Sequence, residues 1–315
     1  MAKNVKSREN VTLPHESNIK FLIDGGCETT LIFHEKLDLP YFAAYTLLES
    51  EGGTAALQRY YAPYLDVAKR HGLGFVLETP TWRASADWGK LLGHDAARLA
   101  KLNAAAVNLL QDMRRNARPT QVPIVVSGCI GPRGDGYTVG TEMTADEAEA
   151  YHQPQIDAFK ATGADMATAL TMTYDAEAIG ITRAAQKAGL PIVVSFTTET
   201  DGTLPSGQAL GDAISQTDGA TGNGPIYFMV NCAHPDHFAN VLNGPWVDRI
   251  GGFRANASRM SHAELDEAEE LDDGDPIEFG TLHRELVTTL PNVHVIGGCC
   301  GTDHRHVDEV ARALS

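Results

Sequence analysis

The feature that most constrains the fold is a regular alternation of short apolar runs with longer segments of helical pattern. Eight runs have the length and composition of buried strands, and they lie at residues 20–24, 75–79, 123–128, 165–170, 191–196, 226–231, 247–253 and 293–298. Continuous apolar strands alternating with helices are typical of a parallel sheet covered on both faces. Eight such repeats predict an α/β fold, the single-domain (β/α)8 TIM barrel. An open doubly wound sheet is the alternative that the pattern leaves open.

The segments between these runs carry helix signals. The clearest helical segments are residues 91–117, 144–163 and 175–190. Thr144 followed by Glu147 is a capping-box signature, and Gly189 is a usual residue at a helix C-terminus. The acidic run at 263–280 predicts a solvated helix and loop on the barrel rim.

Length and charge limit the organisation and the partners. The 315 residues suffice for one barrel of about 250 residues with extensions, and we divide them into an extended or disordered arm (1–18) and a barrel (19–315). A net charge of −16 argues against a nucleic-acid or anionic membrane partner. No run approaches the roughly 18 apolar residues of a membrane span, and the polar N-terminus lacks a secretory signal. These features predict a cytoplasmic protein, and they are compatible with an oligomer.

The cysteines are distributed unevenly over the predicted strands. Cys299 and Cys300 are adjacent and follow the eighth predicted strand, and Cys232 follows the sixth. Adjacent cysteines are poor disulfide partners, and clustered cysteines in a reducing compartment indicate metal ligands or catalytic groups. Because barrel strands end on one rim, the three sulfurs can converge and leave an open fourth position on a tetrahedral zinc, as catalytic zinc requires. Cys27 and Cys129 are not needed for this geometry and are expected to be small buried hydrophobes.

Two other functions remain open at this point. The double glycine at 297–298 is also compatible with a phosphate-binding barrel such as an aldolase or isomerase. That reading predicts a catalytic lysine at a strand end, and no predicted strand ends in lysine. A non-catalytic zinc-binding or thiol-sensing barrel is the second alternative. The paired cysteines favour a metal site, because phosphate binding has no use for them.

The order of several motifs resembles the homocysteine S-methyltransferase family, which includes betaine- and S-methylmethionine-dependent enzymes. These motifs are DGG at 24–26, SGCIGPRGDGY at 127–137, SFTTETDGTLPSG at 195–207, VNC at 230–232 and GGCCGT at 297–302. The resemblance runs from about residue 21 to 312. It implies a (β/α)8 barrel with a catalytic zinc held by Cys232, Cys299 and Cys300. It also implies methyl transfer from a sulfonium or ammonium donor (S-methylmethionine, S-adenosylmethionine or betaine type) to a zinc-bound thiol, with homocysteine giving methionine.

The resemblance also suggests which residues contact the small-molecule thiol and the cationic methyl donor. The predicted substrate-binding residues are Asp24, Gly25, Gly26, Glu28, Thr79, Asn231 and Asn256. An aromatic wall would favour a cationic donor, because ring faces attract cations. Trp82, Tyr137 and Phe253 are the candidates for such a wall on the rim.

Two positions depart from the family pattern. The fourth strand usually ends in a Glu-Thr pair whose Glu helps to hold the amino group of homocysteine, and here the pair reads Leu170-Thr171. Glu28 replaces a glycine of the usual turn after the first strand. An unpaired buried ammonium costs several kcal/mol, to order of magnitude, so we hypothesise that Asp24 and Glu28 share it. The alternatives are that Glu28 merely begins a helix, where an acid suits the dipole, and that the acceptor is a different thiol.

Overall fold

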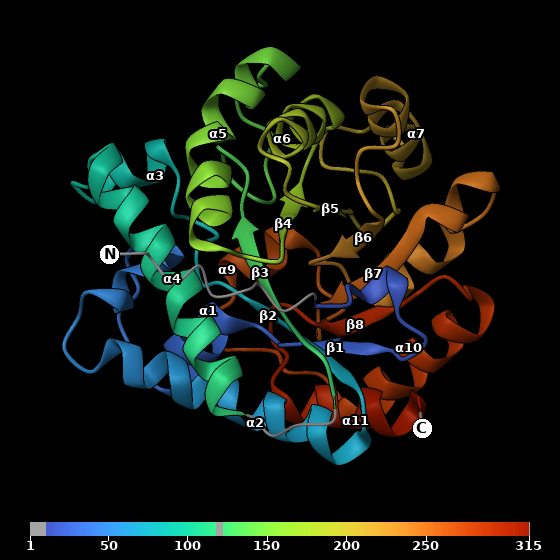
Figure 1. The fold of residues 1–315 in the computed structure, drawn as a ribbon. Helices are drawn as coiled ribbons and strands as arrows, with labels where there is room; N and C mark the ends of the chain where they lie inside the picture. Colours follow the sequence, from blue (N-terminus) through green and yellow to red (C-terminus); the bar gives the residue numbers. More distant parts are fainter. Residues whose placement is uncertain (1–10, 118–121, 315) are drawn as a thin grey trace.

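Eight parallel strands close into a barrel in chain order in the computed structural model, which describes residues 11–117 and 122–314. The strands are β1 (Phe21–Ile23), β2 (Gly74–Glu78), β3 (Ile124–Ile130), β4 (Met166–Met172), β5 (Ile192–Thr197), β6 (Phe228–Asn231), β7 (Ile250–Ala255) and β8 (Val295–Gly298). Pairing of Phe21 with Val295 joins β1 to β8 and closes the barrel (Figure 1). This closure confirms the TIM barrel and excludes the open doubly wound sheet.

Helices surround the barrel and follow most of its strands (Figure 1). The longer ones are α2 (Gly53–His71), α4 (Ala96–Asn116), α5 (Ala145–Thr162), α6 (Asp175–Ala188), α7 (Leu210–Thr221), α10 (Pro276–Thr289) and α11 (His304–Leu314). The short ones are α1 (Cys27–Thr29), α3 (Ala86–Leu91), α8 (Pro235–Phe238) and α9 (His262–Glu267). The structure confirms the capping box at the start of α5 and the left-handed C-cap Gly189 of α6.

Two of the predicted element starts lie three or more residues from the observed ones. The helix expected from residue 91 begins only at Ala96, because Gly93 adopts a left-handed φ of 72° and Asp95 caps α4 by accepting a hydrogen bond from Arg98 N at 2.8 Å. The strand expected from residue 247 begins at Ile250, because residues 245–249 form a 3-10 turn. Both errors come from local turns inside segments whose overall pattern was correct.

Inward-facing side chains change character along the barrel axis. The part of the barrel interior farther from the C-terminal ends of the strands is apolar and includes Phe21, Ile23, Val76, Val125, Met166, Val193, Met229 and Val295. Leu13 packs into this cluster, and residues 14–16 form a 3-10 turn, whereas residues 1–10 of the predicted arm lie outside the described residues. Towards the C-terminal ends of the strands the inward positions become polar, with Glu78 on β2 and Arg254 on β7. The apolar layer therefore supports a charged layer at the end where barrel enzymes carry their sites.

Phe253 corrects one prediction. It is completely buried and stacks on Phe238 at a centroid distance of 5.3 Å, within the layer between barrel and helices. Successive side chains of a strand point to opposite faces, so Phe253 points outward because Arg254 points inward. Phe253 is therefore a packing residue and not part of an aromatic wall.

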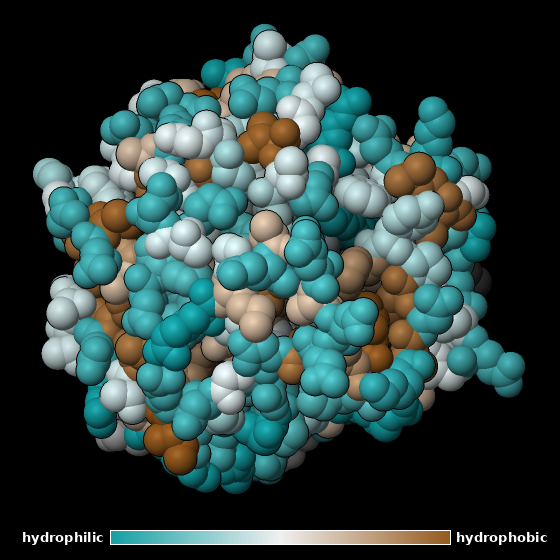
Figure 2. Space-filling view, turned by 180° about the vertical axis from the view of Figure 1, so that it is seen from behind, coloured by the Kyte–Doolittle hydropathy of each residue, from teal (hydrophilic) through white to brown (hydrophobic). Residues whose placement is uncertain are grey.

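The surface carries few large apolar areas on the face opposite that of Figure 1. Figure 2 shows this face as largely hydrophilic, with small and separate hydrophobic patches. No helix in the described ranges combines the length and apolar character needed to cross a membrane.

Candidate active site

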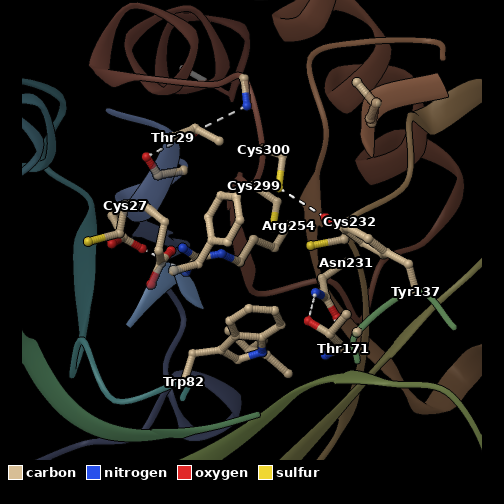
Figure 3. A pocket seen from close by; sticks show the side chains of 18 of the residues that line it. Cys27, Thr29, Trp82, Tyr137, Thr171, Asn231, Cys232, Arg254, Cys299 and Cys300 are labelled. Atoms are coloured by element: carbon tan, nitrogen blue, oxygen red, sulfur yellow. Dashed lines mark hydrogen bonds and ion pairs between the residues drawn. The ribbon is translucent and has the colours of Figure 1, made fainter. Parts of the chain in front are cut away.

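A cavity of about 330 Å³ opens at the C-terminal ends of the strands (Figure 3). Residues at or after the ends of β1 to β4 and β6 to β8 line it, so nearly the whole rim contributes. All five cysteines of the chain are among these residues: Cys27, Cys129, Cys232, Cys299 and Cys300. The cavity therefore collects the thiols from sequence positions far apart.

Three of these sulfurs form a cluster. The Sγ atoms of Cys232, Cys299 and Cys300 lie within 4.8 Å of one another, which confirms the convergence predicted from the strand order. The intervening strand β7 ties the two loops together, because Cys232 N donates to Arg254 O at 3.0 Å and Cys299 N donates to Ala255 O at 2.7 Å. Cys232 has a left-handed φ of 53°. Such a conformation costs on the order of 1–3 kcal/mol and is concentrated at functional sites.

The side chain of Asn256 connects the two cysteine loops through hydrogen bonds to their backbone. Its Nδ2 donates to Cys232 O at 3.0 Å, and its Oδ1 accepts from Cys300 N at 3.1 Å. The side chain is 2 % exposed and is not among the residues that line the cavity. Predicted as a substrate-binding residue, Asn256 is placed by the structure as a positioning residue for the sulfurs.

Tyr137 approaches the cluster from the loop after β3. Its hydroxyl lies 3.1 Å from Cys300 Sγ (Figure 3), and its ring stacks on His262 at 4.1 Å. His262 Nε2 in turn lies 2.7 Å from Cys232 O. His262 begins α9 in the acidic segment. That segment forms the expected helix and loop, but Leu265, Asp266, Ala268 and residues 270–272 line the cavity, so it is a wall of the site as well as a solvated rim.

The floor of the cavity holds a buried ionic network. Arg254 Nη1 donates to Asp24 Oδ1 at 2.6 Å and to Glu78 Oε2 at 2.9 Å, and Nη2 donates to Gly25 O at 2.7 Å. Tyr60 donates to the second oxygen of Asp24 at 2.9 Å. Both oxygens of Asp24 are thus engaged. Sequence reasoning missed Glu78 and Arg254, although a charged residue at an inward position of an apolar strand was a signal that could have found them.

Burial raises the pKa values of both carboxyl groups in this floor. Burial raises the pKa of Glu78 to about 7, against the opposing effect of Arg254. Burial also raises the pKa of Asp24, again with Arg254 as the main opposing influence. Oε1 of Glu78 has no hydrogen-bond partner within the described ranges.

Glu28 differs from Asp24 in having no fixed partner. It lies on α1, half-buried, and lines the cavity. Its carboxylate accepts a hydrogen bond from its own backbone N–H but has no hydrogen-bond or ion-pair partner on another residue in the described ranges. Burial raises its pKa to about 7. Glu28 is therefore the acid at this end of the pocket that can respond to a ligand.

The glycines after β1 allow that turn to pack against the cysteine loop. A Cβ on Gly26 would lie 2.7 Å from Cys299 O, and one on Gly25 would lie 2.7 Å from Thr302 O. Gly26 N donates to Thr302 O at 3.0 Å in the same contact. Of the two predicted residues, Gly26 lines the cavity, whereas Gly25 contributes its carbonyl to the Arg254 network.

Thr79 and Asn231 line the cavity with side chains that are already hydrogen-bonded. Thr79 Oγ1 accepts from Cys129 N at 2.8 Å. Asn231 Oδ1 accepts from Ser195 Oγ at 2.6 Å and from Thr171 N at 3.0 Å, and Nδ2 donates to Thr171 Oγ1 at 3.0 Å (Figure 3). Thr171 has a left-handed φ of 64°, which the amide of Asn231 holds in place. Leu170 also lines the cavity.

Trp82 forms an aromatic wall opposite the sulfurs (Figure 3). The loop after β3 packs closely on it, because a Cβ on Gly131 would lie 2.6 Å from Trp82 Cδ1 and one on Gly136 would lie 2.9 Å from Cζ2. The same loop presents Tyr137. The structure thus places Trp82 and Tyr137 in the cavity wall, as predicted for two of the three aromatic candidates.

Fold and site together define a TIM-barrel protein with a cluster of three cysteine sulfurs beside a charged pocket on its catalytic rim. The family model for homocysteine S-methyltransferases matches residues 21–314, so the chain belongs to this family and is a methyltransferase. No curated protein sequence matches the chain.

Solved structures support the fold. The oxidized form of the homocysteine methyltransferase MmuM from Escherichia coli is similar with a TM-score of 0.74 and 18 % identity, over 96 % of this chain and 98 % of that one. The metallated form of the same enzyme has a TM-score of 0.70 and 18 % identity, over 94 % of this chain and 96 % of that one.

Proposed function

We propose that the protein is a zinc-dependent thiol methyltransferase that converts homocysteine to methionine. The methyl group would come from a cationic sulfonium or ammonium donor of the S-methylmethionine, S-adenosylmethionine or betaine type. The observation that carries this proposal is the cluster of three cysteine sulfurs within 4.8 Å of one another at the rim of a substrate-sized cavity. Membership of the family supports thiol methylation.

The donor set fits zinc. Zinc–sulfur bonds of about 2.3 Å in a tetrahedral site separate the sulfurs by about 3.8 Å, which the observed cluster allows. Hydrogen bonds from the sulfurs of Cys232 and Cys300 lower the pKa of the Cys299 thiol, whereas the hydrogen bond to Cys299 and burial raise the pKa values of Cys232 and Cys300. When bound, zinc would ionise the acceptor thiol at neutral pH.

The remaining residues bind and orient the two substrates. The acceptor's ammonium would pair with Glu28, since Arg254 and Tyr60 already engage Asp24. Trp82 and Tyr137 offer ring faces to the cationic donor. A bond forms between the acceptor sulfur and the methyl carbon while the bond from that carbon to the donor breaks, and its electron pair leaves with the neutral donor product. Alignment of the two partners supplies much of the rate.

A different acceptor thiol is a second candidate for the same chemistry. Leu170 cannot pair with an ammonium, and both oxygens of Asp24 are engaged. These observations favour an acceptor with less positive charge than homocysteine carries. Comparison of homocysteine with its des-amino analogue distinguishes the two acceptors.

The metal assignment can be tested by replacing one ligand. Wild-type protein is expected to carry close to one zinc per chain by metal analysis, and Cys300→Ser should lose both the zinc and thiol methylation. Cys129→Ser is the matched control, because Cys129 lines the cavity outside the three-sulfur cluster. Full zinc content in Cys300→Ser would refute the assignment. Zinc-loaded wild type that methylates none of homocysteine, cysteine or small alkyl thiols from any of these donors would instead indicate a non-catalytic zinc protein.

A further inference from the structure

Arg83 is a buried cation in the wall of the cavity. Its side chain is 5 % exposed and lies between two indole rings, with Cζ 3.9 Å from the Trp82 ring centroid and 3.8 Å from that of Trp88. Nη1 donates to Gly134 O at 2.9 Å. Stacking on both faces and this hydrogen bond hold the guanidinium in one orientation.

No buried carboxylate balances the charge of Arg83. The one carboxylate within 4 Å, among the residues that the structure describes, is that of Asp135, whose Oδ2 lies 3.6 Å from Nη2 and whose side chain is 49 % exposed. Nε of Arg83 is buried and has no hydrogen-bond partner in the same ranges. Burial lowers the pKa of Arg83 to about 10.

Arg254 shows what a balanced guanidinium in this cavity looks like. It has two buried carboxylates at 2.6 and 2.9 Å and a carbonyl at 2.7 Å, although its Nε is also without a hydrogen-bond partner in the described ranges. The two arginines therefore differ in their carboxylate partners. A buried charge without such partners is costly. The indole faces attract the cation, but they do not accept the hydrogen bonds that the guanidinium N–H groups offer in the guanidinium plane. Arg83 therefore has donor capacity and charge left for an anion in the cavity.

We infer that Arg83 binds the carboxylate of a zwitterionic substrate. The inference rests on the proposed function, because homocysteine and the S-methylmethionine and betaine types of donor each carry a carboxylate and a cationic group. A guanidinium fixed in its plane suits the two oxygens of a carboxylate. Glu28 lines the same cavity and lies close enough to act on the pKa of Arg83, so the two supply opposite charges to one zwitterion.

The charge of the surroundings argues against a simple anion as the ligand. Asp135, Asp266 and Glu270 lie around the same cavity and would repel a phosphate or another dianion. A zwitterion brings its own cation to these carboxylates. The cavity therefore selects a carboxylate that is attached to a positive group.

Equilibrium binding tests the inference without turnover. Calorimetry would compare methionine with methioninamide on zinc-loaded protein at pH 6.5, where both α-amines are largely protonated. Wild type should bind methionine about tenfold to a hundredfold more tightly, as expected for a charge-assisted hydrogen bond. Arg83→Gln should reduce this ratio to near one, and Arg83→Lys should give an intermediate ratio because it keeps the charge but loses the planar fork.

Arg133→Gln is the matched control. Arg133 is an arginine of the adjacent loop that pairs with Asp87 outside the cavity, so its loss should leave the ratio unchanged. Zinc content and circular dichroism check that each variant is folded. Equal binding of methionine and methioninamide to wild type would overturn the inference without any variant, as would an unchanged ratio in folded Arg83→Gln.

Kinetics then identify which substrate carries the carboxylate. The kcat/KM of wild type and Arg83→Gln would be measured with the carboxamide of the donor and, separately, with that of homocysteine. For the substrate that Arg83 holds, replacing the carboxylate by a carboxamide should lower kcat/KM at least tenfold in wild type. The same replacement should not lower kcat/KM in Arg83→Gln. Zinc-dependent methylation with no carboxylate preference would refute the Arg83 inference alone. Arg83-dependent binding of methionine without methylation of any thiol would refute the proposed function alone.

Discussion

Asp24 and Glu28 are four residues apart, yet their carboxylates have different surroundings. Asp24 is held by Arg254 and Tyr60, whereas Glu28 faces the cavity without a fixed partner. Neighbours of this kind decide the role of a carboxylate more than its position in the sequence does. Asp24 supports the floor of the pocket, and Glu28 is the residue that a substrate ammonium would meet.

The pH dependence of acceptor preference should reveal this role. Glu28 has a pKa raised to about 7, so its carboxylate ionises as the pH rises through that value. The ratio of kcat/KM for homocysteine to that for its des-amino analogue should therefore increase between pH 6 and 8. Ionisation of the acceptor thiol largely cancels in this ratio. Glu28→Gln should give a ratio that is low and nearly independent of pH.

The stability of the same variant supplies the control. A carboxyl group whose pKa is raised on folding destabilises the folded state as the pH rises from the unfolded value of about 4.5 through about 7. Glu28→Gln should therefore be at least as stable as wild type at pH 8 by thermal unfolding. If homocysteine kinetics are unaffected in Glu28→Gln and the des-amino thiol is the better substrate, Glu28 does not bind the ammonium.

At the level of elements, three segments at the rim make separate connections to the cysteine loops. The turn after β1 packs on one of them through Gly26, β7 binds both cysteine loops through backbone hydrogen bonds, and the loop after β3 brings Tyr137 to Cys300. Helix α2 also contributes, because Tyr60 donates to Asp24, whereas no residue of α5 lines the cavity. A substitution at the cap of such a helix should therefore lower the free energy of unfolding without changing methyltransferase activity.

Thr144 provides that test, because its capping box lies at the start of α5. Thr144 Oγ1 accepts from Glu147 N at 3.3 Å, and Glu147 Oε2 accepts from Thr144 N at 2.8 Å. Thr144→Ala should lower the free energy of unfolding by about 1 kcal/mol, measured by denaturant titration, with zinc content and kcat/KM unchanged. Thr288→Ala, at an exposed position inside α10, is the control that should not destabilise. Equal effects of the two changes would show that the cap contributes nothing.

At the scale of the whole molecule, the proposed metal would join two parts of the rim that the chain connects only through more than sixty residues. Cys232 follows β6, and Cys299 and Cys300 follow β8, with β7 between them. A ligand that binds only the folded state stabilises it by mass action. Zinc is therefore expected to contribute to the stability of the barrel as well as to its chemistry.

Chelation should lower the unfolding temperature and leave the thiols open to oxidation. Closely spaced thiols with thiolate character oxidise readily, so chelated protein kept in air should lose methyltransferase activity. Zinc together with a reductant should restore both activity and unfolding temperature, whereas zinc alone should not. Activity that persists after chelation and exposure to air would argue against a zinc–thiolate centre.

Several features of this protein were determined by local sequence alone. Eight apolar runs separated by helical segments predict a closed parallel barrel, which the structure confirms. Parallel strands end on one rim, so the meeting of Cys232 with Cys299 and Cys300 followed from the order of the strands. The helix signals at Thr144 and Gly189 were equally local, and the structure confirms them. Patterns of this kind are readable because the periods of strand and helix are fixed by backbone geometry.

Only the tertiary structure decided the partners of each side chain. Strand register made Arg254 face inward and Phe253 outward, and this single choice placed a guanidinium between Asp24 and Glu78. The positioning role of Asn256 likewise required the folded loops. A shift of one residue in a strand exchanges its two faces, and contacts between distant segments leave no periodic trace in the chain. The sequence therefore specified the barrel and its sulfurs, and packing specified which charges meet beside them.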